Sequence, residues 1–144
     1  MLNGISTVAK SYPVAPILVA LFTAFSLFSP FFLTSGNIEA MLAANSVVLI
    51  ASIGMTLVFL IGGIDLSIST VISASAVISG LAMAATDSIF IGVLTAIGVG
   101  FSFGLINGIL IGFFGLTPFI TTMATQLIAR GIAFVLSQGI AVQG

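Results

Sequence analysis

The sequence predicts an all-α fold, a polytopic bundle of about five helices that cross a lipid bilayer. Hydrophobic residues make up 60% of the 144 residues, charged residues 3%, and the mean hydropathy is +1.43. A soluble domain carries about 25% charged residues, so this chain cannot cover a surface that faces water. Its apolar runs are continuous over about 20 residues, the length of a membrane-spanning helix. They lack the alternation of barrel strands, and helices satisfy their own backbone hydrogen bonds in lipid.

Turn-forming residues divide the chain into five predicted spans within one transmembrane domain that covers residues 1–144. A turn cluster at 34–37 separates the first two spans, and Asn37 is expected to cap the second helix with Glu39 near its positive end. Gly62 and Gly63 interrupt the longest apolar stretch. The predicted spans are 14–33, 39–61, 66–85, 88–114 and 118–137.

The later breaks carry equally clear signals. The apolar stretch 66–114 is too long to cross a bilayer once, and Asp87 divides it. Gly115 followed by Pro118 indicates a helix end and a new start, because proline suits the first turn of a helix.

Orientation is predicted from Lys10, the one cation outside the predicted spans. The apolar run that follows Lys10 is longer than the apolar core of a signal peptide, so we expect a retained helix. Cytoplasmic flanks are enriched in Lys and Arg, which places the N-terminus in the cytoplasm. Residues 62–66 and 115–117 are then cytoplasmic, and Asp87 and residues 139–144 lie outside.

Composition also limits the chemistry. The chain contains no His and no Cys, so disulfides, thiolate or imidazole metal sites and Cys or His nucleophiles are excluded. Two cations cannot form a basic surface for nucleic acid. No phosphate-binding G-x-x-x-x-G-K-[ST] loop occurs. The three carboxylates are scattered, which disfavours an intramembrane enzyme. We expect no cofactor.

Small residues recur at every fourth position of the fourth span, a pattern that lets helices approach closely in lipid. We interpret this stripe as a helix-packing surface. The third span has a milder stripe that includes Ser69 and Ser73, whose hydroxyls could line a polar path or bond to carbonyls of their own helix. The members of the main stripe are Gly92, Ala96, Gly100, Gly104, Gly108 and Gly112.

Polar side chains inside the predicted spans are candidates for a hydrophilic path. The alternative interpretation is hydrogen bonding that holds helices together. An uncompensated Arg in mid-membrane costs at least about 2.5–3.5 kcal/mol, so Arg130 should face a bundle interior, a watery cavity or a partner. Snorkelling toward the outer interface is the other possibility for it. The candidates are Asn45, Ser52, Thr56, Asn107, Thr122, Gln126 and Arg130.

Asp65 has two possible roles. The predicted topology disfavours an ion pair with Arg130, which lies 12 residues beyond Pro118 and so about 18 Å deeper. We expect instead that Asp65 caps the third helix by accepting bonds from amides near Ser67 and Ile68. Gly62 and Gly63 would provide the backbone freedom for the break.

These residues also carry a family resemblance. The string Gly-Gly-Ile-Asp-Leu-Ser at 62–67 contains Gly62, Gly63, Asp65 and Ser67. Together with Gly-Met-Thr-Leu-Val at 54–58, it resembles the membrane-spanning permease of ribose-type sugar ABC importers. The strings at 104–108, 118–122 and 129–131 resemble the same family in order and spacing. The sequence departs from the family pattern after Ser67, lacks a basic residue at 112–117, and is similar to an N-terminal portion only.

The resemblance implies a permease that is not itself an enzyme. It implies a separate ABC ATPase subunit that supplies hydrolysis, an extracytoplasmic binding protein that delivers sugar, and a second permease copy or paralogue. The location it implies is the bacterial inner membrane, with many passes through the lipid bilayer. Two alternatives stay open: a secondary transporter or channel subunit, and an inactive truncated membrane fragment.

Overall fold

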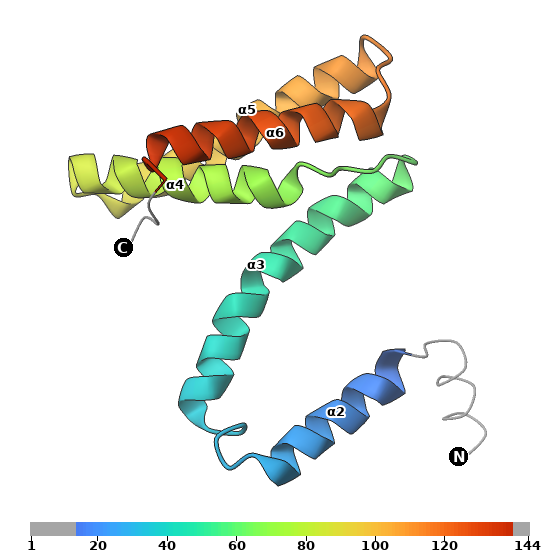
Figure 1. Ribbon diagram of the computed structural model, residues 1–144, viewed down its shortest axis with the longest axis vertical. Coiled ribbons are helices and arrows are strands. Elements are labelled where there is room, and N and C mark those ends of the chain that lie inside the picture. The colour runs from blue at the N-terminus through green and yellow to red at the C-terminus, as the bar shows by residue number, and fades with distance from the viewer. Residues whose placement is uncertain (1–13, 140–144) are drawn as a thin grey trace. The chain divides into compact units, whose positions relative to one another are not determined.

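The computed structural model describes residues 14–139, and all regular elements in that range are α-helices (Figure 1). This confirms the all-α fold. Four of the helices, α3 to α6, are long and apolar enough to cross a membrane. Lys10, on which the orientation rests, lies outside the described residues. The helices are α2 (Val14–Phe28), α3 (Ser35–Leu60), α4 (Ile68–Thr86), α5 (Ile89–Gly112) and α6 (Pro118–Leu136).

The chain divides into two compact units, Met1–Ile50 and Ala51–Gly144. The first contains α2 and the beginning of α3. The second contains the end of α3 and the three helices α4, α5 and α6. Helix α4 packs against both α5 and α6, and the three lie side by side in Figure 1.

In the first unit, the first helix ends earlier than predicted, at Phe28 instead of residue 33. Pro30 explains the difference, because proline disfavours helical backbone at the residue before it and cannot donate a backbone hydrogen bond. Beyond the proline, Phe32 folds back onto α2. Its ring centroid lies 5.2 Å from that of Phe22 and 5.6 Å from that of Phe25.

The prediction that Asn37 caps the second helix is wrong. Helix α3 begins at Ser35, and the amide of Ile38 already donates to the carbonyl of Thr34. Asn37 therefore lies within the first turn. Its side-chain nitrogen donates to the Phe32 carbonyl at 2.7 Å, so the residue fixes the preceding turn and caps no helix.

In the second unit, α3 ends in a glycine-terminated Schellman motif. Gly62 has a φ of 75°, which L residues rarely adopt, and its amide donates to the Phe59 carbonyl at 2.9 Å. The Gly63 amide donates to the Val58 carbonyl at 3.0 Å. The predicted backbone freedom is thus confirmed at Gly62, and an extended segment follows before α4 begins.

The predicted break at Asp87 is confirmed as well. Asp87 adopts a left-handed φ of 51°, and its amide donates to the Met83 carbonyl at 2.8 Å, which ends α4. Ser88 then caps α5, its side chain accepting from the Ile91 amide at 3.5 Å. Close packing follows directly, since a Cβ added at Gly92 would lie 2.1 Å from the Met83 Cγ atom.

The break between α5 and α6 also follows the prediction. Gly115 has a φ of 68°, and Pro118 is the first residue of α6. The break at 61–67 precedes α4, and the break at 113–117 precedes α6. Because α4 and α6 run parallel, both start from the same side of the unit. Asp87 lies at the other end.

Candidate functional site: a buried polar cluster and two grooves

The buried core of the second unit is mostly polar. Among the described residues the fully buried hydrophobic side chains are those of two alanines, Ala74 and Ala129. Large apolar side chains point outward along every helix, as expected for a protein whose solvent is lipid. The buried polar residues are Ser67, Thr70, Asn107, Thr121, Thr122 and Thr125.

Asp65 organises the segment that leads into α4. Its Oδ1 atom accepts hydrogen bonds from the Ser67 amide at 2.7 Å and from the Ser67 hydroxyl at 2.6 Å. The predicted bond from the Ser67 amide to Asp65 is therefore present. Asp65 is not the cap residue itself, because α4 begins at Ile68 and its N-cap is Ser67. The ion pair with Arg130, which the sequence disfavours, is absent among residues 14–139, where Arg130 has no carboxylate partner.

Ser67 continues the chain of hydrogen bonds across the bundle. Its hydroxyl oxygen accepts from the Nδ2 atom of Asn107 on α5 at 3.2 Å. The Oδ1 atom of Asn107 in turn accepts from the Thr125 hydroxyl of α6 at 2.5 Å. One connected network thus joins the segment before α4 to both neighbouring helices.

Thr122 holds the same segment from α6. Its hydroxyl oxygen accepts from the Leu66 amide at 3.1 Å and lies 3.3 Å from the Ile64 carbonyl, to which it can donate. Thr122 lies four residues beyond Pro118, the first residue of α6. The extended segment before α4 therefore lies beside the second turn of α6 and not beside its first residue. We call Asp65, Ser67, Asn107, Thr122 and Thr125 the polar cluster.

The polar cluster satisfies the groups that an interrupted helix exposes. Non-helical backbone is tolerated at membrane depth only where protein or water supplies hydrogen-bond partners. Here side chains of α5 and α6 supply them. No buried side-chain nitrogen or oxygen of the described residues lacks a partner, and none of their acidic residues gather into a metal-binding group. Side chains of α5 and α6 thus hold the non-helical segment between α3 and α4 in place through hydrogen bonds.

A cavity of about 320 Å³ adjoins the polar cluster. Asp65, Asn107 and Thr122 line one part of it, and Gly104, Gly108 and Gly112 another. A Cβ added at any of these three glycines, or at Gly100, would meet no atom within 4 Å. Of the predicted stripe, then, Gly92 packs closely within the described chain. For the other four glycines, helix packing stays a prediction.

The seven candidates for a hydrophilic path lie in different places. Asn107 and Thr122 belong to the polar cluster. Asn45 lies on α3 in the first unit, where its side chain donates to the Met41 carbonyl at 2.7 Å. In the second unit, Thr56 on α3 donates to the Ser52 carbonyl at 2.7 Å. Gln126 is half-buried on α6, and Arg130 is exposed one turn further along.

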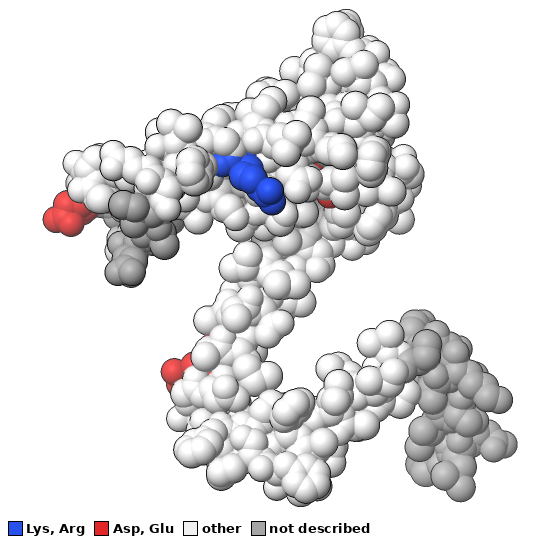
Figure 2. All heavy atoms as spheres, in the orientation of Figure 1, with Lys and Arg blue, Asp and Glu red and all other residues white. Residues whose placement is uncertain are grey.

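Arg130 lies in a groove between α4 and α6, which we call the polar groove because its lining combines Arg130 and three serines with apolar side chains. The groove has a volume of about 370 Å³ and is lined by Ser69, Ser73, Phe134 and Ser137 in addition to Arg130. Figure 2 shows one basic side chain on this unit, surrounded mainly by residues without charge. It belongs to Arg130, the one cation among the described residues.

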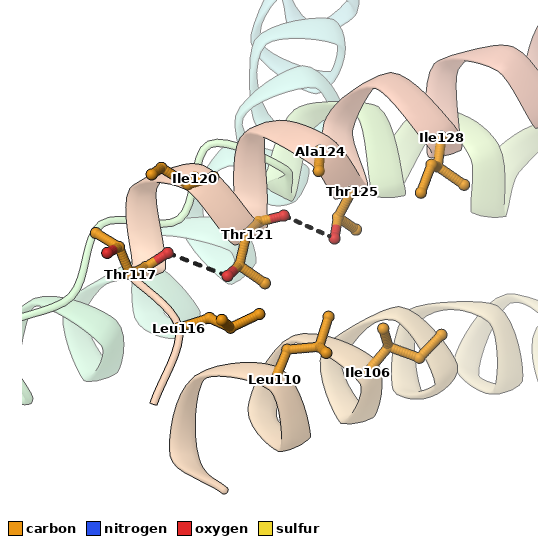
Figure 3. Close-up of a pocket in the computed structure, with 9 residues that line it drawn as sticks. All are labelled: Ile106, Leu110, Leu116, Thr117, Ile120, Thr121, Ala124, Thr125 and Ile128. Carbon is orange, nitrogen blue, oxygen red and sulfur yellow. Dashed lines mark hydrogen bonds between the residues drawn. The ribbon is translucent and has the colours of Figure 1, made fainter. Parts of the chain in front are cut away.

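A second groove, between α5 and α6, is apolar. Its volume is about 300 Å³, and Ile106, Leu110 and Ile128 line it (Figure 3). Two threonines line the groove, and the protons of both hydroxyls are already used. Thr121 donates to the Thr117 carbonyl at 3.0 Å, and Thr125, whose hydroxyl oxygen lies 3.1 Å from the Thr121 carbonyl, donates to the Asn107 Oδ1 atom. This groove therefore offers little polarity to a ligand.

Thr125 is a member of the polar cluster that was not predicted from the sequence. The signal was present, because hydroxyl residues at 121, 122 and 125 lie close together on a helix of 3.6 residues per turn. What the sequence lacks is the register of α5 against α6, which brings Asn107 to Thr125.

Comparison with known proteins gives the family. Residues 37–143 match the family described as the permease component of branched-chain amino acid transport systems. No solved structure matches the chain significantly.

Curated relatives match most of the chain. It is 36% identical to the L-arabinose ABC transporter permease protein AraH of Azospirillum brasilense, over 97% of this chain and 41% of the relative. It is 36% identical to the D-allose transport system permease protein AlsC of Escherichia coli, over 89% of this chain and 39% of the relative. It is 30% identical to the ribose import permease protein RbsC of Escherichia coli, over 85% of this chain and 38% of the relative.

The chain thus spans about 40% of the length of the curated relatives that it matches. The resemblance drawn from residues 54–67, 104–108 and 118–131 is confirmed, as is a multi-pass membrane protein of the bacterial inner membrane. The chain belongs to the permease family of ABC importers, and the three relatives described above are named as sugar permeases.

Proposed function

We propose that this chain forms part of the translocation path of an ATP-driven sugar importer. The polar cluster is the observation that carries the proposal. It joins the string Gly-Gly-Ile-Asp-Leu-Ser, a motif of the resemblance, to α5 through the bond between Ser67 and Asn107 and to α6 through the bond between Leu66 and Thr122. A third bond, between Asn107 and Thr125, joins α5 to α6. A permease that alternates its access needs helices that move as units, and this network ties α4, α5 and α6 into one unit.

The substrate class follows from the relatives. Those matched here are named for L-arabinose, D-allose and ribose, and others for fructose. A neutral monosaccharide is therefore the proposed cargo. Within the second unit, its path would be lined by the predicted polar residues that lie outside the polar cluster: Ser52, Thr56, Gln126 and Arg130.

The proposed partners supply what this chain does not contain. An ABC ATPase subunit hydrolyses ATP, an extracytoplasmic binding protein delivers the sugar, and a second permease copy or paralogue completes the membrane assembly. The N-terminus lies in the cytoplasm, as the position of Lys10 predicts. Because the chain covers about 40% of its relatives, the rest of a permease is needed for uptake.

Sugar uptake in a strain that lacks its own L-arabinose permease tests the proposal. Residues 37–143 replace the aligned part of the Escherichia coli L-arabinose permease, and uptake of radiolabelled L-arabinose, D-allose, D-ribose and D-fructose is measured with and without the ATPase subunit. We expect uptake of at least one sugar by the chimaera, dependent on the ATPase. The 144-residue chain alone should give none.

Two results would contradict the proposal. One is a chimaera that reaches wild-type abundance in the membrane yet takes up none of the four sugars. The other is uptake by the 144-residue chain in vesicles without any ATPase, since this would indicate a carrier or a channel.

A further inference from the structure

The groove between α4 and α6 contains the Arg130 guanidinium, a charged group whose exposure to hydrocarbon costs free energy. Arg130 lies within α6, a helix apolar enough to cross a membrane, and its side chain is exposed. It has no ion-pair partner among residues 14–139. Exposing such a group to hydrocarbon costs at least about 2.5–3.5 kcal/mol. The Arg130 guanidinium therefore needs water, a polar ligand or another polypeptide beside it.

The neighbouring side chains make this face polar on both helices. The Ser69 hydroxyl on α4 has no hydrogen-bond partner among the described residues. That of Ser73, one turn further, donates to the Ser69 carbonyl at 3.0 Å, which leaves its oxygen free to accept. Directly after the last residue of α6, the Ser137 hydroxyl donates to the Phe134 carbonyl at 3.3 Å in the same way. The polarity thus faces the groove from both sides.

This combination matches the chemistry of a monosaccharide. Arg130 offers up to five N–H donors and no acceptor, whereas each serine oxygen can accept. A sugar ring presents hydroxyl oxygens that accept from the guanidinium and hydroxyl protons that donate to serines. The ring of Phe134, 67% exposed at the groove, offers an apolar surface for the C–H face of the sugar.

We infer that the α4–α6 groove is a water-facing binding site for a neutral monosaccharide, in which Arg130 donates hydrogen bonds to sugar hydroxyl oxygens. This rests on the proposed function, and it names the part of the path that contacts the cargo. The apolar α5–α6 groove, on the other side of α6, faces lipid or protein.

The absence of cysteine from the sequence gives a direct test. Single cysteines are introduced by Ser69→Cys and Ser73→Cys in the polar groove, and by Ala124→Cys in the apolar groove as the matched control. The 144-residue chain in membrane vesicles is treated with a negatively charged, membrane-impermeant methanethiosulfonate. We expect labelling several-fold faster at the two groove positions than at Ala124→Cys.

Sugar protection tests the binding itself. L-arabinose, D-allose, D-ribose and D-fructose are each added before the reagent, and at least one should slow labelling of Ser73→Cys. Adding Arg130→Gln should weaken that protection by about tenfold, the effect of losing one hydrogen bond to a charged group. Arg130→Lys, which keeps the charge, should retain part of it. A positively charged methanethiosulfonate serves as a control. If Arg130→Gln slows labelling by the negative reagent but not by the positive one, the substitution has changed the local charge and not the access to the groove.

Three results would overturn the inference. Groove cysteines that label as slowly as Ala124→Cys would show that lipid or protein covers the face. Fast labelling that no sugar slows would show a wet groove without a sugar site. Protection by phosphate or acetate in place of sugars would show an anion site. Failure of uptake combined with protection by sugar would contradict the proposed function and leave this site standing.

Discussion

Single hydrogen bonds satisfy the polar groups that are buried beside the break between α3 and α4. Asn107 is 7% exposed and bonds to both Ser67 and Thr125, so each partner that is lost leaves one of its atoms unsatisfied. Side-chain hydrogen bonds between membrane helices contribute on average about 0.6 kcal/mol and at most about 1.7 kcal/mol. The effects expected at the residue scale are therefore modest and need matched controls.

Thr125→Val should lower the free energy of unfolding by about 0.6–1.7 kcal/mol. Valine keeps the shape of threonine but cannot donate to the Asn107 Oδ1 atom. The measurement is a titration with sodium dodecyl sulfate in mixed micelles, followed by circular dichroism.

Thr121→Val is the control for this prediction. Thr121 is as well buried as Thr125, at 5% against 4% exposed, but its hydroxyl bonds only to the Thr117 carbonyl of its own helix. Equal losses in the two variants would mean that the bond from Thr125 to Asn107 contributes nothing.

At the scale of elements, helix ends depend on a few backbone conformations. Gly62 occupies a φ of 75° at the end of α3, and a Cβ there would meet no atom within 4 Å. The cost of a side chain at Gly62 is thus conformational. A substitution at Gly62 therefore reports on backbone conformation alone, whereas a substitution at Gly92 reports mainly on packing.

Gly62→Ala should destabilise the protein by about 1–2 kcal/mol, the cost of left-handed backbone for an L residue. Gly36→Ala, in the first turn of α3 and equally free of neighbours, should be neutral or slightly stabilising. The same detergent titration measures both. If Gly62→Ala were as stable as Gly36→Ala, the Schellman motif at the end of α3 would be in doubt.

Gly92→Ala should weaken the packing of α4 against α5, because the new methyl group would lie 2.1 Å from the Met83 Cγ atom. Shortening the neighbour in Gly92→Ala/Met83→Ala should restore part of the lost thermal stability. Gly98→Ala has open space and should gain about 0.5–1 kcal/mol in helix stability. A loss at Gly98 equal to that at Gly92 would contradict this account of the interface.

Helix ends were the features most accessible from the sequence. Gly62, Asp87 and Pro118 impose backbone conformations locally, so their breaks could be predicted without tertiary contacts. The early end of α2 was missed because the apolar run through residue 33 hides the effect of Pro30. The bond between Asn107 and Thr125 depends on the packing register of two helices, which no local pattern contains.

At the scale of the whole molecule, the antiparallel order of α4 and α5 separates their ends across the bilayer. Helix α4 has 19 residues and α5 has 24, which correspond to about 28 Å and 36 Å. Both match a hydrocarbon core of about 30 Å. Asp87 and the turn at 113–117 must then lie at opposite membrane surfaces.

Sidedness of labelling at these two ends tests the central claim, that the chain crosses the membrane as a bundle of helices. Single cysteines are placed by Asp87→Cys and Leu116→Cys and treated with an impermeant maleimide in right-side-out and inside-out vesicles. We predict labelling of Asp87→Cys from the outer side and of Leu116→Cys from the cytoplasmic side. Labelling of both positions from the same side would contradict the claim.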